Sequence, residues 1–292
     1  MAVYERAYRP YEGPTTPEKS RFLVLPRYAF QQALSSKLFV AFLIAWFLWP
    51  LFLALMIYLP HNLSILERWG LTSEELQILP LFRQNAKWFF GWFMIPMGPV
   101  AFVVTLVVGP ALVSVDLRNN GLPLYLARPF SRTEYILGKM TVLAILLSAV
   151  SWIPGLVLFL LRSYFAGWSW FTGNLRIGAA IFLGSWIWIL LLCVLSLALS
   201  AYLKWRPVAG MALLGVFFIA SAVSGLLQVL LRTQWAAIIN ISDMMGVVWA
   251  GLFGVETPIS VPGPAAWASL LIFCGLCVWL LYRKVRAYEV VR

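Results

Sequence analysis

The Asp, Glu, Lys, Arg and His side chains of this sequence lie outside its long apolar runs, and the most informative group extends from Asp116 to Lys139. Within this segment, Ser131 and Glu134 have the spacing of a capping box, in which each side chain bonds to a free backbone N–H at a helix start. Pro129 must end any helix that precedes it, because proline lacks the N–H donor and disfavours a helical residue before it. We therefore expect a helix of one to two turns before Pro129 and a long helix that begins near Arg132.

The short helix has the pattern of a docking element. It presents Leu122, Tyr125 and Leu126, and it is flanked by Arg118 and Arg128. A short amphipathic element of this kind can insert into a groove on a soluble partner. The alternative interpretation is that it lies on the membrane surface.

Other residues with reactive side chains are sparse. Cys274 and Cys277 form a CxxC pair, but they have no second pair and no nearby histidine, so we interpret them as packing residues. His61 lies just outside the first apolar run, where we expect an incidental interfacial histidine. The sequence has no G-x-x-x-x-G-K-[ST] phosphate loop. We expect no catalytic residue, bound cofactor or metal in this chain.

Composition indicates a membrane protein. The 292 residues are 62% hydrophobic and 11% charged, whereas soluble domains carry roughly a quarter charged residues. Lys and Arg outnumber Asp and Glu by 22 to 11, but they lie beside apolar runs and not on a water-soluble face, which argues against a nucleic-acid partner. Membrane lipid is the expected surrounding.

Six apolar runs without any Asp, Glu, Lys, Arg or His are long enough to cross a hydrocarbon core of about 30 Å. They cover residues 38–59, 88–115, 140–161, 178–203, 208–231 and 264–282. The predicted fold is an all-α polytopic membrane protein with six transmembrane helices. Residues 1–37 form a cytoplasmic segment, and residues 38–292 form the transmembrane domain with a short basic tail. Within the first segment, 26–37 favours an interfacial amphipathic helix over a merely solvated lead-in.

The distribution of basic residues predicts the orientation, because cytoplasmic flanks retain positive charge. With both ends of the chain in the cytoplasm, the outer side holds six of the 22 basic residues and the inner side holds the other 16. The six outer residues are Arg68, Arg83, Lys87, Arg162, Arg176 and Arg232. We therefore predict an N-in, C-in topology.

The last outer connection, 232–263, contains apolar stretches that are too short to span the membrane, and we expect one or two re-entrant, half-inserted helices there. Within the spans, Pro96, Pro99, Pro110 and Pro154 should bend the second and third helices and free carbonyls that must face protein or water. The 15 tryptophans are interpreted mainly as interfacial belts.

Small residues recur four apart in the fourth and fifth spans, at Ala180 and Gly184 and at Ser221 and Gly225. This spacing allows close helix contact. We interpret both pairs as helix-packing or dimer contacts and not as transport residues.

The segment between the second and third spans resembles the signature loop of type-2 ATP-binding-cassette exporter permeases. The resemblance rests on Asp116-Leu-Arg-Asn-Asn, Leu124-Tyr-Leu-Ala-Arg128-Pro, Ser131-Arg-Thr-Glu-Tyr135 and Gly138-Lys139. It implies a permease subunit in a bacterial cytoplasmic (inner) membrane that pairs with a second copy or a related permease and docks cytoplasmic ATPase subunits. ATP and Mg²⁺ would bind to those partners. The coupling helix would lie around 122–128, and the implied ATPase-coupling residues are Asp116, Arg118, Leu122, Tyr125, Leu126, Arg128, Pro129, Arg132 and Glu134.

Three other function classes fit the residues less well or remain open. An ion-coupled transporter normally has ionisable residues in mid-membrane, and none of the six spans offers one. An intramembrane enzyme needs a polar catalytic group of residues, which the spans also lack. A non-transporting subunit of a larger complex, with a mechanical or structural role, stays open. The apolar interior favours an amphipathic or lipid-like cargo.

Overall fold

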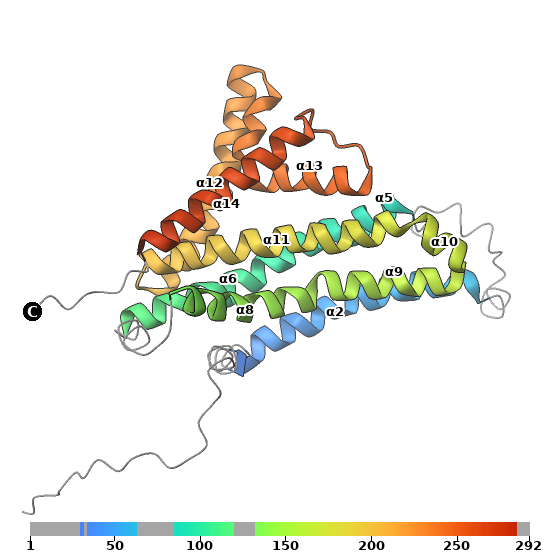
Figure 1. Ribbon diagram of the computed structural model, residues 1–292, viewed down its shortest axis with the longest axis horizontal. Helices are drawn as coiled ribbons and strands as arrows, with labels where there is room; N and C mark the ends of the chain where they lie inside the picture. The colour runs from blue at the N-terminus through green and yellow to red at the C-terminus, as the bar shows by residue number, and fades with distance from the viewer. Residues whose placement is uncertain (1–29, 32–33, 63–84, 120–131, 285–292) are drawn as a thin grey trace, which may run out of the picture.

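The computed structural model describes residues 30–31, 34–62, 85–119 and 132–284, and every regular element within these ranges is a helix (Figure 1). Among the described residues, six helical segments are long and apolar enough to cross a membrane, in agreement with the six predicted spans. They are Lys37–His61, Ala86–Asp116, Thr133–Ala166, Leu175–Tyr202, Arg206–Leu231 and Gly263–Lys284. Half of the predicted interfacial helix, residues 26–29 and 32–33, lies outside the described residues. Phe30, Gln31 and Leu34 are helical, and Ser36 caps the separate helix that begins at Lys37. The N-in, C-in orientation remains a prediction.

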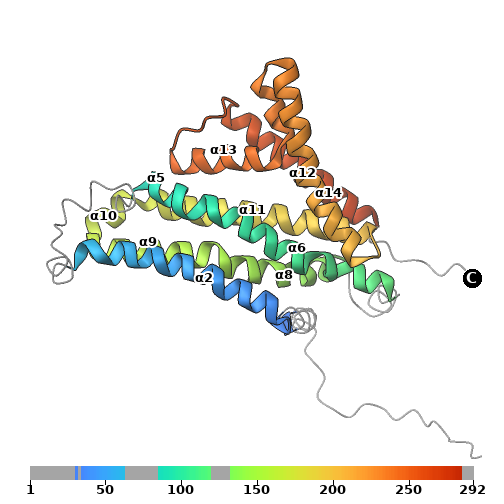
Figure 2. The same ribbon diagram turned by 180° about the vertical axis from the view of Figure 1, so that it is seen from behind.

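The helices form two groups around α11 (Leu175–Tyr202). On one side, α6 (Ile95–Arg118), α8 (Arg132–Val150) and α9 (Trp152–Ala166) pack against it, and α2 (Lys37–Tyr58) packs against α8 and α9 (Figures 1 and 2). On the other side are α12 (Arg206–Leu231), α13 (Ile241–Phe253) and α14 (Gly263–Lys284). Most of α11 is buried, whereas most of α12 is exposed. The fourth span is therefore the core of the chain.

The third span consists of two helices that meet at Ser151. Pro154 has no N–H to give to the carbonyl of Val150, four residues earlier, and the helix breaks between α8 and α9. The Val150 carbonyl is not left without a donor, because the indole Nε1 of Trp46 in α2 donates to it at 3.0 Å. The predicted bend is present, and the carbonyl that Pro154 frees faces protein.

In the second span, too, a tryptophan of α2 donates to a carbonyl that lies four residues before a proline. It begins with α5 (Ala86–Trp88) and a π-helical stretch, η4 (Phe89–Met94), before α6. Pro96 cannot donate to the Trp92 carbonyl, and the indole of Trp49 donates to that oxygen at 2.9 Å. Tryptophans of α2 thus satisfy two carbonyls near prolines, which is a structural role that the interfacial-belt interpretation does not include.

The α6 and α11 backbones approach each other closely at Gly109. A Cβ atom on Gly109 would lie 1.9 Å from Ser196 Oγ and 2.9 Å from Ser196 Cβ. Such distances are far inside van der Waals contact, so only glycine fits at this position. This close approach joins the second span to the central fourth span.

Two short helices, η5 (Gln234–Ile239) and α13, fill the connection between the fifth and sixth spans, where the sequence predicts one or two. The α13 helix packs between α11 and α14. Its last turn is held by Arg176 of α11, whose Nε donates to Leu252 O at 2.9 Å and whose Nη2 donates to Gly251 O at 2.8 Å. A guanidinium at a helix C-terminus supplies donors to the carbonyls of the last turn, and Gly251 O also accepts from the Gly254 N–H at 3.3 Å.

Candidate functional site

The segment that the sequence singles out is closed by an ion pair at its two ends. Asp116, near the end of α6, lies 2.9 Å from Nζ of Lys139 in α8. The two side chains are 15% and 10% exposed, respectively, so the pair is largely shielded from water. A carboxylate and an ammonium group at this distance attract strongly when the surroundings are poor in water.

Tyr135 completes this group, which we call the loop clamp (Asp116, Tyr135 and Lys139). The Tyr135 hydroxyl donates to Asp116 Oδ2 at 2.8 Å, and its side chain is fully buried. Tyr135 and Lys139 are four residues apart, so both lie on the face of α8 that meets α6. The Lys139 ammonium also lies 5.7 Å from the centre of the Tyr135 ring. Three side chains therefore fasten the ends of one loop to each other.

The described residues include part of the predicted ATPase-coupling set. Asp116 belongs to the loop clamp, and Arg118 and Glu134 have exposed side chains beside it. Arg132 is the first residue of α8, as predicted for the helix start, but its side chain lies outside the described part. The remaining predicted residues, Leu122, Tyr125, Leu126, Arg128 and Pro129, also lie outside it, as does Ser131 of the capping box. The docking helix stays a prediction.

The two small-residue pairs occupy different surroundings. Ala180 and Gly184 are buried in α11, and a Cβ on Gly184 would lie 2.9 Å from the Trp249 ring. Ser221 and Gly225 have exposed positions on α12, and nothing lies within 4 Å of a Cβ on Gly225. The first pair thus contacts helices of the same chain, while a dimer contact at the second remains a prediction.

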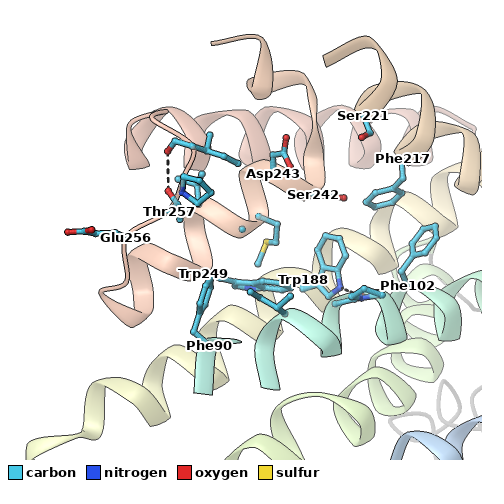
Figure 3. A pocket seen from close by; sticks show the side chains of 18 of the residues that line it. Phe90, Phe102, Trp188, Phe217, Ser221, Ser242, Asp243, Trp249, Glu256 and Thr257 are labelled. Carbon is cyan, nitrogen blue, oxygen red and sulfur yellow. Dashed lines mark hydrogen bonds between the residues drawn. The ribbon is translucent and has the colours of Figure 1, made fainter. Parts of the chain in front are cut away.

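A second candidate site, which the sequence reasoning missed, is a cavity of about 540 Å³ between α6, α11, α12 and α13. This volume is in the range of small-molecule sites. Aromatic rings dominate its walls, and Figure 3 shows them converging from separate helices: Phe90, Phe102, Trp188, Phe217 and Trp249. We call this the aromatic cavity.

The rings of the aromatic cavity are held in fixed positions. Trp188 Nε1 donates to Gly98 O at 3.2 Å, and Trp249 Nε1 donates to Gly184 O at 2.9 Å. The two indoles meet edge to face with centroids 5.7 Å apart, and the Phe217 ring lies 5.9 Å from that of Trp188. Because each indole N–H already has an acceptor, the indoles offer mainly their ring surfaces to the cavity.

Asp243 is one of two acidic residues in these walls. It lies in the first turn of α13, is half-buried, and has no ion-pair partner among the described residues. Burial raises the pKa of its carboxyl above the ordinary value, and a hydrogen bond with the Asn240 side chain opposes that rise. The sequence signal for this residue is a lone acidic side chain between two apolar stretches, which the sequence reasoning treats only as part of a connection.

Comparison of the sequence with protein-family models and with curated proteins finds no match. The resemblance of the loop residues is therefore the support for a family assignment.

The histidine and the cysteines of the CxxC pair lie in contacts that stabilise the fold. His61 Nε2 accepts a hydrogen bond of 2.8 Å from Arg162 Nη1, and its Nδ1 donates to Ile57 O at 2.9 Å. Cys277 is buried and Cys274 is half-buried within α14. Among the described residues, no group of three or more His, Cys, Asp or Glu side chains could hold a metal ion.

Proposed function

We propose that this chain is the transmembrane permease subunit of an ATP-binding-cassette exporter. In this proposal, a separate cytoplasmic ATPase binds the loop between α6 and α8, and ATP hydrolysis drives movement of a substrate across or out of the membrane. The observation that carries the proposal is the loop clamp, because it joins the two spans that flank the segment where the sequence resembles a coupling loop.

The loop clamp would transmit a displacement of the loop to the membrane-spanning helices α6 and α8. A loop with free ends would absorb a push from a partner by bending, whereas a loop with joined ends passes the displacement to both of its helices. Both α6 and α8 pack along α11, and α11 in turn contacts α13 and α14. A partner that moves the loop would therefore act on the core of the chain and, through it, on the second helix group.

The partners in this proposal supply what the chain itself lacks. The sequence has no phosphate-binding loop, so ATP and Mg²⁺ would bind to the ATPase subunits. A second permease copy or a related permease would cover apolar surface, and α12 offers such surface because large side chains along it are exposed, Met211, Phe218 and Leu230 among them. In this proposal, the spans lie in the lipid bilayer of a bacterial inner membrane.

The test uses the chain with its native ATPase. A tagged chain is purified from its native membranes, and a co-purifying subunit with a phosphate-binding loop and ATPase activity is expected. Leu126→Asp combined with Arg128→Glu should abolish the stimulation of that ATPase by the permease while the permease remains folded in the membrane. Lys204→Glu, a charge reversal at an exposed residue between α11 and α12, serves as the matched control and should keep the stimulation.

Two results would contradict the proposal. One is full stimulation and transport in the double variant, which would show that the loop does not couple the two activities. The other is a purified complex that contains no ATPase, which would favour a structural membrane subunit. An intact ATPase complex that moves no cargo in proteoliposomes would favour the mechanical role that the sequence leaves open.

A further inference from the structure

The aromatic cavity combines a ring-lined wall with an acidic group, and no Lys, Arg or His is present among the described residues that line it. Its two acidic residues are Asp243 and Glu256. Figure 3 shows the Glu256 side chain at the margin and directed away from the rings, whereas Asp243 lies between Glu256 and Phe217, across the cavity from the two indoles. One carboxylate therefore sets the charge of the site.

The aromatic rings favour a cation for a separate reason. The face of an aromatic ring carries negative electrostatic potential, and a positive group within about 6 Å of the ring centre is attracted to it. The Trp188, Phe217 and Phe102 rings adjoin one another, since Phe102 and Phe217 meet with centroids 4.7 Å apart. An anion would face both these rings and the Asp243 carboxylate, so the cavity disfavours it.

The Asp243 carboxylate shares a hydrogen bond with the Asn240 side chain but has no positively charged side chain beside it among the described residues. A partly desolvated carboxylate is stabilised by a neighbouring positive charge, and none of the described residues provides one. In apolar segments of membrane proteins, an ionisable residue of this kind commonly marks a binding site. The unpaired carboxylate favours a ligand with a positive charge, and the apolar walls favour a ligand with an apolar part.

We propose that the aromatic cavity binds a small amphiphilic organic cation, with its apolar part against the Trp188 and Phe217 rings and its charge paired with Asp243. A neutral lipid-like molecule would leave the carboxylate unpaired, and a metal ion would leave the ring surfaces unused. The binding site does not depend on an ATPase. The interpretation of this site as the place where cargo binds does rest on the proposed exporter function. In that case, the predicted amphipathic cargo is a cation.

The test compares two ions of nearly the same shape and opposite charge. The full-length chain is purified in an uncharged detergent, and binding of tetraphenylphosphonium and tetraphenylborate is measured by calorimetry at neutral pH. We expect the phosphonium ion to bind at least tenfold more tightly than the borate. Asp243→Asn should weaken phosphonium binding by tenfold or more, whereas Asp243→Glu, which keeps the carboxylate, should retain most of it.

A second pair of variants tests the ring wall. Phe217→Leu keeps an apolar side chain but removes the aromatic face, and it should weaken phosphonium binding severalfold, whereas Phe217→Tyr should preserve it. Phe217 is suited to this test because it is only partly buried, so that the substitutions leave the packed core in place. Thermal unfolding and size-exclusion profiles of all four variants establish that each is folded before its binding is compared.

Three results would overturn the inference: equal binding of the two ions, unchanged phosphonium binding in Asp243→Asn, or no binding by the folded wild-type chain. Failure of the exporter proposal has a different signature. In that case, phosphonium binding and its dependence on Asp243 persist, but the cation neither stimulates the ATPase of the purified complex nor is moved by it in proteoliposomes.

Discussion

Trp46 in α2 donates its indole N–H to the backbone carbonyl of Val150, the oxygen that Pro154 leaves without its helical donor. The bond is buried and joins residues 104 positions apart. A backbone carbonyl without a hydrogen-bond donor inside the membrane costs on the order of several kcal/mol, because no water is present to bind it. The first span is therefore fastened to the break in the third span by a bond that compensates for a proline.

This relationship predicts coupling between Trp46 and Pro154. Trp46→Phe should lower the free energy of unfolding by roughly 1 kcal/mol or more, because it removes the donor to Val150. In a Pro154→Ala background, the introduced alanine supplies its own backbone N–H to that carbonyl, so the same substitution should cost less. Chemical unfolding in detergent micelles across the four-member double-mutant cycle gives the coupling energy, which we expect at about 0.5–1.5 kcal/mol.

The cycle also separates the hydrogen bond from packing. The loss of ring volume in Trp46→Phe occurs in both backgrounds and cancels in the cycle. A coupling energy near zero would mean that the Val150 carbonyl finds another donor when the indole is absent.

The loop clamp predicts an asymmetric response to neutralisation. Lys139→Met should lower the free energy of unfolding by about 2–4 kcal/mol, because it leaves the shielded Asp116 carboxylate with the Tyr135 hydroxyl but without its cation. Asp116→Asn combined with Lys139→Met should recover most of that loss, since no unpaired charge remains. Lys204→Met, at an exposed position, is the control and should change stability by less than about 0.5 kcal/mol. Chemical unfolding in detergent micelles measures all three variants.

In these variants, stimulation of the partner ATPase should not change in parallel with the free energy of unfolding. If the loop clamp transmits force, the double neutral variant should be stable but poorly stimulated by the partner ATPase. Normal stimulation in that variant would reduce the ion pair to a stabilising contact.

The contact between α6 and α11 predicts a steric effect at Gly109. Gly109→Ala should destabilise the chain by about 1–3 kcal/mol, because its Cβ would lie 1.9 Å from Ser196 Oγ. Ser196→Gly should relieve this clash in the double variant. Ser196→Ala alone should be nearly neutral, since Ser196 Oγ is buried without a hydrogen-bond partner in the described structure.

The matched control for Gly109 is Gly275 in α14. A Cβ at Gly275 meets nothing within 4 Å, and alanine in a helix interior is favoured over glycine by up to about 1 kcal/mol. Thermal melts should therefore show Gly275→Ala unchanged or more stable. A Gly109→Ala variant that melts like the wild type would show that the two helices separate without cost.

The sequence predicts the spans well because each is a long run without charges, and the lipid environment leaves a backbone there little choice except the helix. It also locates the bend near Pro154 and the helix start near Arg132. It does not reveal which group satisfies the Val150 carbonyl, because the donor Trp46 lies far away in sequence and resembles any interfacial tryptophan. The aromatic cavity is missed for the same reason: its rings come from separate helices, and their convergence depends on how those helices cross.

The raised pKa of Asp243 predicts how this residue affects stability. Burial disfavours the charged carboxylate in the folded chain, so between its ordinary pKa and the raised folded value the folded state holds a proton that the unfolded state has released. In that window the contribution of Asp243 to stability falls as pH rises. Asp243→Asn should therefore raise the melting temperature of the ligand-free chain at neutral pH and flatten this pH dependence, which thermal melts over the same pH range measure.

Cation binding at Asp243 should have the opposite pH response, because it needs the carboxylate. Affinity for tetraphenylphosphonium should fall as pH drops below the raised pKa of Asp243, by roughly tenfold per pH unit once protonation dominates. Calorimetric titrations from about pH 8 to about pH 3, a range that brackets the ordinary carboxyl pKa, check this. Asp243→Asn is the reference and should show weak binding of nearly constant strength. Wild-type affinity that stays constant over the same range would show that the Asp243 charge does not hold the cation.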